Sequence, residues 1–311
     1  MTRRIRNLGI ALVALLAIGF AASEIWPERA AKLMLAGLYA SAGLQERTVT
    51  ISQGPVHYLD GGEGEAVVFL HGVYALKEHW IDMSRPVSGP YRTIILDLPG
   101  FGENPRFRAE DYDFDKQSDH VYEALDQIGI DTFHMVANSM GAQIGATMAT
   151  AQPDRVQTLT FVGSPIGVRS PVASDMEQAL ATGHKPLVVT TPEEYDARMA
   201  WLFPKTPFLP RPIARTWRKT EVSHAESNVG IWETLVGSEV AMLEQVAPGL
   251  NMPSLIIWCD QDRIFHFSGA EVLDQALPNS ELIMPEGCGH LPMLDRARAT
   301  GNDVLEFLNR H

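Results

Sequence analysis

A serine at the end of an apolar run is the residue of this sequence with the clearest capacity for chemistry. Ser139 follows the run at positions 132–138, and the small residues Ala137 and Gly141 stand on either side of it. A strand that ends in a tight, small-residue turn before a helix is typical of a nucleophile elbow, which projects one hydroxyl above a sheet. A serine that caps a helix has similar neighbours. The nucleophile hypothesis therefore depends on partners elsewhere in the chain.

A carboxylate and a histidine follow in the order that a serine nucleophile needs. Asp262 and His290 each come shortly after an apolar run. A serine hydroxyl is a weak nucleophile that needs a base, and the base needs an acid to orient it. We predict that Ser139 is the nucleophile, His290 the base and Asp262 the orienting acid. Asp260, in the same loop as Asp262, is the alternative acid.

Acyl transfer also needs N–H groups that stabilise a developing oxyanion. The backbone N–H of Met140, directly after Ser139, is one candidate, and the N–H of Val73, after an early strand, is the second. We interpret His71, near Val73, as a histidine that braces its loop through backbone hydrogen bonds and not as a second catalytic histidine. Asp97, after the following strand, is interpreted as a scaffold residue that ties loops together.

The elements that must position these residues alternate between strands and helices. Positions 48–52 and 55–59 predict an antiparallel hairpin. The later strands are expected at 66–70, 92–98, 132–137, 156–162, 253–258 and 281–284, and helices at 114–128, 139–151, 268–277 and 296–308. The pattern predicts a mostly parallel, doubly wound α/β sheet.

A proline- and aromatic-rich region interrupts this alternation between about residues 163 and 240. A segment of this length is too long for an irregular loop, so we expect it to form its own helices. It is interpreted as a helical cap inserted into the α/β domain. Its aromatic residues either form a small core of their own or line an apolar acyl pocket.

Composition narrows the classes of partner and cofactor. The chain has 311 residues, of which 45% are hydrophobic, and this suits one large α/β domain. Its net charge of −13 argues against nucleic-acid binding, which needs a basic surface. The two cysteines, Cys259 and Cys288, are too few for a disulfide scaffold. We expect free thiols, with a single bridge possible in an oxidising compartment.

The N-terminus combines a basic cluster with an apolar stretch. Arg3, Arg4 and Arg6 precede residues 8–22, whose length lies between that of a signal peptide and that of a spanning helix. Trp26 follows, as is typical of a membrane interface. We favour a retained membrane anchor, with the catalytic domain on the non-cytoplasmic side (periplasmic in a bacterium); the alternative is secretion after cleavage.

Together these segments resemble the α/β-hydrolase superfamily, and within it the membrane-anchored monoacylglycerol lipase and esterase branch. The motifs that carry the resemblance are His71-Gly72-Val73 with Lys77 and Trp80, Asp97-Leu98-Pro99-Gly100-Phe101-Gly102, Asn138-Ser139-Met140-Gly141, Asp262, and Cys288-Gly289-His290-Leu291-Pro292-Met293. The resemblance implies the Ser139, Asp262 and His290 triad and a lid formed by the insert. Ala137, Ala142 and Cys259 depart from the family's usual residues, and we expect altered packing there without loss of activity.

The sequence therefore predicts an esterase or lipase that acts on monoacylglycerol or medium-chain acyl esters, without a metal or organic cofactor. We expect an N-terminal segment at 1–44, a hydrolase core at 45–163 and 241–311, and a cap at 164–240. A C–C bond hydrolase of the meta-cleavage-product type is the alternative, since such enzymes have a similar elbow; Leu291 and the N-terminal segment count against it. A non-catalytic binding protein of the same fold is the third possibility.

Overall fold

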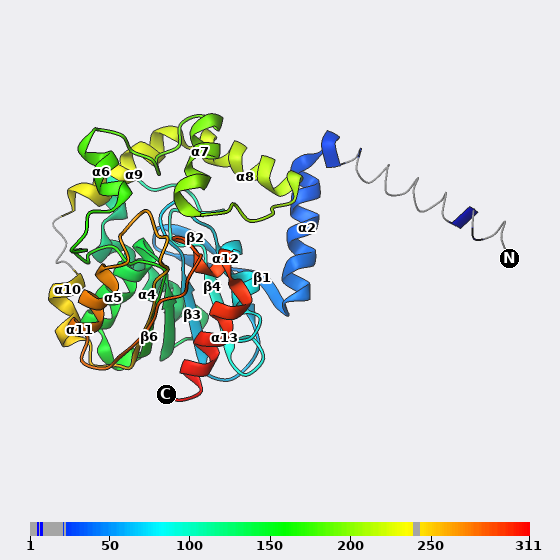
Figure 1. Cartoon of the computed structure of the whole chain (residues 1–311). Coiled ribbons are helices and arrows are strands. Elements are labelled where there is room, and N and C mark those ends of the chain that lie inside the picture. The colour runs from blue at the N-terminus through cyan, green and yellow to red at the C-terminus, as the bar shows by residue number, and fades with distance from the viewer. Residues whose placement is uncertain (1–4, 6, 9–20, 22, 239–242) are drawn as a thin grey trace.

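An eight-stranded sheet forms the centre of the computed structural model, which describes the chain except residues 1–4, 6, 9–20, 22 and 239–242 (Figure 1). The strand order is β1-β2-β4-β3-β5-β6-β7-β8. The strands are β1 (Leu44–Ile51), β2 (Gly54–Gly61), β3 (Ala66–Leu70), β4 (Arg92–Leu96), β5 (Phe133–Ala137), β6 (Val156–Val162), β7 (Ser254–Ile257) and β8 (Ser280–Ile283). From β4 to β8 all neighbouring strands are parallel, as predicted.

The predicted hairpin is the antiparallel edge of this sheet. Strands β1 and β2 pair antiparallel through the whole of their length, and β2 also pairs antiparallel with β4. Most side chains of β1 are exposed, whereas every side chain of β3 and β5 is buried. A strand covered on both faces has a continuous apolar sequence, which is why β3 and β5 could be recognised from composition alone.

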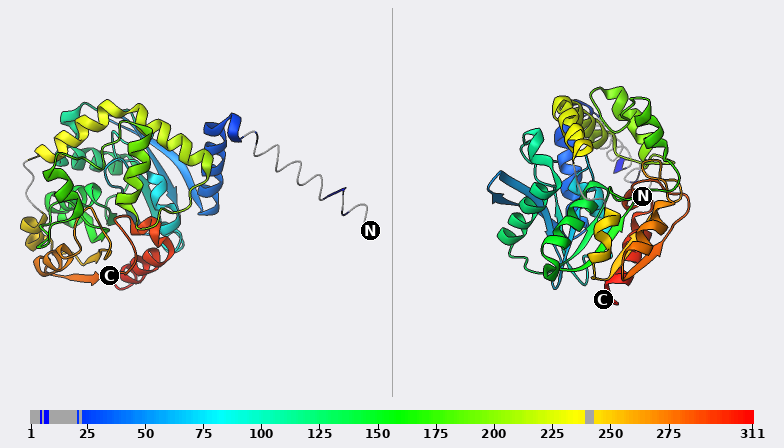
Figure 2. Two further views of the ribbon diagram at one scale, coloured as in Figure 1. Left: turned by 45° about the horizontal axis from the view of Figure 1, so that its top comes forward. Right: turned by 90° about the vertical axis from the view of Figure 1, so that its left-hand side faces the viewer.

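Helices cover both faces of the sheet, and Figure 2 shows the sheet between them. On one face Val68 and Leu70 of β3 pack in a core with residues of α4 (Phe114–Ile128), α5 (Met140–Ala151) and α11 (Gly269–Ala276). On the other face Val67 and Phe69 pack in a second core with α3 (Ile81–Ser84) and α13 (Ala297–Leu308). Successive side chains of a strand point to opposite faces, so one strand contributes to both cores.

The proline-rich region contains helices that lie over one end of the sheet (Figure 1). These are α6 (Asp175–Ala181), α7 (Pro192–Leu202), α8 (Arg211–Ser223) and α9 (Ala225–Gly237). Ser174 and Thr191 begin α6 and α7 with capping boxes, and proline occupies the first turn of α7 and of α8. Proline is well accommodated there because its missing N–H has no partner in the first turn. The prolines that interrupt the sequence pattern thus help to begin the cap helices.

The remaining elements connect these layers. They are α2 (Pro27–Ser41), η1 (Lys77–Trp80), η2 (Ala109–Tyr112), η3 (Pro153–Arg155), α10 (Leu243–Val246), η4 (Ala247–Gly249) and α12 (Pro292–Asp295). Helix α2 lies beside α8 at one side of the molecule (Figure 1). None of the described helices has the length and apolarity needed to cross a membrane. Most of the predicted anchor at 8–22 lies outside the described residues.

Candidate active site

Ser139 occupies a strained turn between β5 and α5. Its φ of 51° and ψ of −114° are rare for a residue with a side chain. Such backbone strain persists only where the surroundings enforce it, and it is concentrated at functional sites. A nucleophile elbow requires a sharp, strained turn between a strand and a helix, and this turn has that conformation.

Two glycines allow the chain to pass close to this turn. A β-carbon on Gly141 would lie 2.5 Å from the carbonyl oxygen of His71 and 2.6 Å from that of Leu70. A β-carbon on Gly72 would lie 2.7 Å from Oδ1 of Asn138 and 3.1 Å from Cβ of Ser139. Side chains at these positions would therefore push the loop after β3 away from the serine.

Ala137 is buried at the end of β5 and packs in the core shared with α4 and α5. Its methyl group thus fills space that a glycine would leave empty. This packing gives a physical account of a position at which the sequence departs from the family's usual glycine.

Asp262 and His290 contact each other at the carboxyl end of the sheet. Nδ1 of His290 lies 3.0 Å from Oδ2 of Asp262, and both side chains are buried. The second carboxylate oxygen of Asp262 accepts hydrogen bonds from the N–H groups of Ile264 and Phe265, at 2.8 and 3.3 Å. The carboxylate is therefore fixed on one side by its own loop and faces the imidazole on the other.

Asp260, the alternative acid, has a different partner. Its Oδ1 accepts a hydrogen bond from the N–H of Gly287 at 2.7 Å. It therefore links the loop after β7 to the loop after β8, while Asp262 is the carboxylate that reaches His290.

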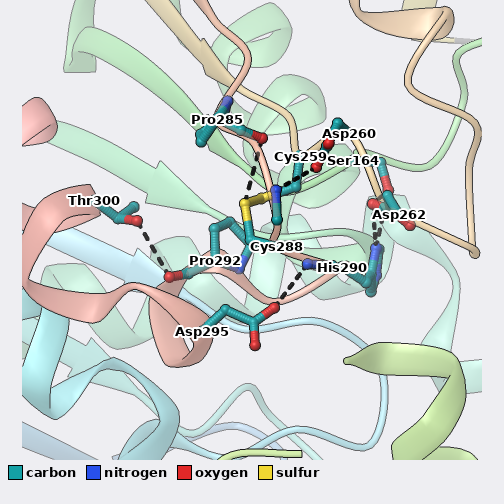
Figure 3. The surroundings of a disulfide bond; sticks show 12 residues. Ser164, Cys259, Asp260, Asp262, Pro285, Cys288, His290, Pro292, Asp295 and Thr300 are labelled. Carbon is teal, nitrogen blue, oxygen red and sulfur yellow. Dashed lines mark hydrogen bonds and ion pairs between the residues drawn. A yellow bond between two sulfur atoms is a disulfide. The ribbon is translucent and has the colours of Figure 1, made fainter. Parts of the chain in front are cut away.

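Ser164 also contacts this pair, and sequence reasoning did not identify it. Its hydroxyl donates to Oδ2 of Asp262 at 2.6 Å and lies 2.9 Å from Nδ1 of His290. The side chain is fully buried. Ser164 follows β6 by two residues, so its position after a strand is the one signal that could have revealed it. Figure 3 shows the three side chains together.

Backbone hydrogen bonds hold the loop that carries His290. The N–H of His290 donates to the carbonyl of Leu202, at the end of α7, at 3.0 Å. The N–H of Gly289 donates to Asp295 at 2.7 Å, and burial raises the pKa of Asp295. The side-chain amide of Asn138 donates to the carbonyl oxygens of Val162 and His290, at 2.7 and 3.3 Å. The residue before Ser139 thus connects the elbow to the histidine loop.

Cys259 and Cys288 form a disulfide, so the expectation of free thiols was wrong. Cys259 follows β7 and Cys288 follows β8, and these parallel strands are neighbours in the sheet. Their carboxyl ends therefore place the two Cα atoms 5.3 Å apart, within the range that a disulfide requires. Figure 3 shows the bond beside Asp262 and His290.

His71 braces its loop, as predicted. The N–H of Leu98 donates to Nε2 of His71 at 2.9 Å, and Nδ1 lies 2.7 Å from the carbonyl of Gly72. These partners require a neutral ring with its proton on Nδ1. Burial lowers the pKa of His71 to about 4, which keeps the ring neutral near pH 7.

Asp97 is a scaffold residue, also as predicted. Its Oδ1 accepts from the N–H of Lys77 and its Oδ2 from the ammonium group of Lys77, both at 2.9 Å. The N–H of Glu103 also donates to Oδ2, at 3.3 Å. Asp97 therefore ties the loop after β4 to the chain around η1.

The groups that are expected to act on substrate have no competing partner among the described residues. There the Ser139 hydroxyl makes no hydrogen bond to His290, and the N–H groups of Val73 and Met140 have no protein acceptor. Catalytic hydrogen bonds are often long before substrate binds. Met140 begins α5, and the N-terminal end of a helix favours negative charge.

Known proteins with similar sequences and structures are hydrolases. A family model described as the alpha/beta hydrolase fold matches residues 65–297. Lipase 1 of Psychrobacter immobilis is 26% identical over 268 residues, which cover 85% of this chain and 84% of that protein. Monoacylglycerol lipase ABHD6 of Homo sapiens is 26% identical over 258 residues, which cover 79% of this chain and 76% of that protein. The crystal structure of a membrane phospholipase A, a bacterial virulence factor, matches with a TM-score of 0.88 and 30% identity over 98% of each chain.

Proposed function

Because the chain belongs to the α/β-hydrolase family and is an ester hydrolase of its lipase and esterase type, we propose that Ser139, Asp262 and His290 form its catalytic triad. The observation that carries this proposal is the strained backbone of Ser139 together with the buried contact between Asp262 and His290. The residues expected to act as nucleophile, acid and base follow β5, β7 and β8. All three strands are parallel, so the residues after them share one edge of the sheet.

In the proposed reaction His290 takes the proton of the Ser139 hydroxyl, and the serine oxygen attacks the ester carbonyl. The N–H groups of Val73 and Met140 stabilise the oxyanion, and His290 returns the proton to the leaving alcohol. Water activated by His290 then releases the acid from the acyl-enzyme. Asp262 keeps the imidazole oriented and stabilises its protonated form.

The proposed substrate is a monoacylglycerol or a medium-chain acyl ester. Two proteins that resemble this chain are named for lipid substrates, one as a monoacylglycerol lipase and the other as a membrane phospholipase A. We propose that residues 164–240 form a lid over the core at 45–163 and 241–311. Helices α6 to α9 lie over one end of the sheet (Figure 1), and the carbonyl of Leu202 at the end of α7 accepts the N–H of His290, in the loop after β8, at 3.0 Å.

We propose further that residues 8–22 anchor the enzyme in a membrane with its catalytic domain on the non-cytoplasmic side. The basic cluster before the apolar stretch favours a cytoplasmic N-terminus. The disulfide between Cys259 and Cys288 supports this placement, because disulfides persist in oxidising compartments. A cleaved signal peptide would lead to the same compartment.

Labelling with a fluorophosphonate probe tests the nucleophile. Folded protein should take one label, and Ser139→Ala should take none. Ser84→Ala is the matched control, because it removes another buried serine hydroxyl and should keep the label. If the folded wild-type protein takes no label, the proposed mechanism is wrong.

The reaction class needs a second assay. p-Nitrophenyl esters and monoacylglycerols of graded chain length should be hydrolysed by the wild-type protein and not by Ser139→Ala. Hydrolysis of a vinylogous dienone, without hydrolysis of any ester, would favour the C–C hydrolase alternative.

A further inference from the structure

We propose that α2, α8 and the loop before α8 form a surface that binds a phospholipid bilayer containing anionic lipids. We call it the α2–α8 face and define it by Ile25, Trp26, Arg29, Lys32, Phe208, Arg211, Arg215, Arg218 and Lys219. The proposal extends the proposed membrane association from residues 8–22 to the folded part of the chain. It does not depend on which ester is hydrolysed.

The first observation is a set of ion pairs between the cap helix α8 and two acidic residues. One of these residues lies just before α2, and the other lies at its start. Glu24 pairs with Arg215 at 2.8 Å and with Arg211 at 3.6 Å. One helical turn further along, Glu28 pairs with Lys219. These ion pairs join the segment that leads from the proposed anchor to the cap helix α8, and Figure 1 shows α2 beside α8 at the side of the molecule.

The second observation is the exposure of large apolar side chains on this surface. Phe208 is 92% exposed, Ile25 65% and Trp26 54%. Phe208 lies three residues before Arg211, and Ile25 and Trp26 directly follow Glu24, so the pair between Glu24 and Arg211 places these side chains on neighbouring segments. Clustered apolar exposure marks a surface that contacts a protein or a membrane. Tryptophan beside an apolar segment favours a membrane interface.

The third observation is positive charge in a chain of net charge −13. Helix α8 carries Arg211, Arg215, Arg218 and Lys219, and α2 adds the exposed Arg29 and Lys32. Nearby carboxylates, those of Glu24, Glu28 and Asp196, neutralise only part of this charge. Basic side chains close to a membrane surface favour anionic lipids. An acidic protein partner would satisfy the charge but would not account for the position of this surface directly after the proposed anchor.

A cleft between α2, α8 and the first residue of α7 offers a place for a headgroup. It has a volume of about 480 Å³, and its lining combines cationic with apolar side chains: Arg215, Arg218 and Lys219 with Pro27, Pro192 and Val222, beside Glu28 and Thr216. Arg215, Arg218 and Lys219 already pair with Glu24, Asp196 and Glu28, so an anionic phosphate there would share the remaining N–H donors of these side chains.

The α2–α8 face is connected to the candidate active site through the loop at 203–210. This loop begins after Leu202, whose carbonyl accepts the N–H of His290 at 3.0 Å. It ends at Arg211, which pairs with Glu24. A bilayer bound at this face would therefore lie next to a loop that directly follows the residue whose carbonyl accepts the N–H of the proposed base.

The test places a fluorophore on Phe208 in the full chain. Phe208→Cys supplies a single free thiol for labelling with an environment-sensitive NBD group, because the two native cysteines are bonded to each other. Val236→Cys, on the exposed side of α9, is the matched control, since Val236 is 64% exposed and lies outside the α2–α8 face. Both labelled proteins are reconstituted into phosphatidylcholine vesicles, with or without phosphatidylglycerol.

With phosphatidylglycerol present, emission from position 208 should shift to shorter wavelength and be quenched by brominated lipids, while position 236 should report water. Arg29→Glu with Lys32→Glu should remove most of this quenching. Unquenched emission from position 208 in vesicles that retain the protein would overturn the proposal, and so would equal quenching with and without phosphatidylglycerol. Hydrolysis of a soluble p-nitrophenyl ester by the same samples tests the proposed function separately.

Discussion

Cys259 and Cys288 covalently join the loop that carries Asp262 to the loop that carries His290. Cys259 lies three residues before the acid and Cys288 two residues before the histidine. The N–H of Gln261 adds a backbone hydrogen bond to the carbonyl of Cys288 at 3.1 Å. The bond therefore constrains the two loops whose side chains must stay in contact.

We expect removal of this disulfide to lower both stability and activity. The cysteines are 29 residues apart, and closing a loop of this size stabilises a fold by about 3–4 kcal/mol in the chain-entropy model. Cys259→Ser with Cys288→Ser should lower the free energy of unfolding by about this amount, measured by urea denaturation. Reductant should destabilise the wild-type protein and leave the double variant unchanged; an equal effect on both would contradict the assigned role.

Ser164 should act as a positioning residue for the proposed triad. Ser164→Ala removes the hydroxyl that donates to Asp262, and a hydrogen bond to a charged group contributes about 1.5–3 kcal/mol. We expect kcat to fall by about 10- to 100-fold. KM should change little, because the buried side chain is not exposed to substrate.

Ser84→Ala is the matched control for this experiment. It removes a buried hydroxyl that donates to the carbonyl of Ile81 within α3, and in the described part of the chain no hydrogen bond links Ser84 to Asp262 or His290. Its kcat should equal that of the wild-type protein on the same p-nitrophenyl ester. If both variants lose activity equally, the effect of Ser164 is one of general packing.

The sequence allowed the fold to be predicted and the site residues to be proposed, because the signals for both are local. The strands β3 and β5 are buried on both faces and read as continuous apolar runs. Ser139 follows β5 by two residues, and His290 lies in the loop after β8; both have small residues beside them. Residues at the carboxyl ends of parallel strands meet at one edge, so the order of the strands was sufficient to bring them together.

Ser164 and the disulfide could not be predicted in the same way, because both depend on contacts between distant segments. Ser164 is separated by 98 residues from Asp262 and by 126 from His290. The pairing of Cys259 with Cys288 requires that β7 and β8 be neighbours in register. Buried cysteine is also common as a small core residue, and composition alone favours that interpretation.

His71 should make stability depend on pH. Its pKa is about 4 in the folded chain because of burial, and about 6.5 in an unfolded chain. Between these values the unfolded chain binds more protons, so stability falls as the pH falls. The contribution is fully present above pH 6.5 and is lost progressively toward pH 4, by about 3 kcal/mol.

Urea denaturation between pH 7.5 and pH 4.5 measures this effect. Protonation would place a second N–H against the N–H of Leu98, which now donates to Nε2. His71→Gln should be less stable than the wild-type protein at pH 7.5 and should lose less stability on acidification. Parallel pH profiles for the two proteins would show that other groups cause the acid sensitivity.

Lys77 should be essential for stability although it lies outside the proposed triad. Its ammonium group is fully buried and lies 2.9 Å from carboxylate oxygens of Asp97 and Glu103 and 3.1 Å from Glu78. Burial alone would lower the pKa of Lys77, but the nearby carboxylates of Asp97 and Glu78 raise it well above its usual value. Lys77 is therefore charged near neutral pH.

Lys77→Met should lower the free energy of unfolding by about 3–5 kcal/mol, because it leaves buried carboxylates without a counter-charge. Lys116→Met is the matched control: Lys116 pairs with Asp111 at 3.1 Å, but its side chain is 46% exposed, so its loss should have little effect. Urea denaturation at pH 7.5 compares the two variants. Equal destabilisation would contradict the argument, because it would mean that burial of the ammonium group does not determine the effect.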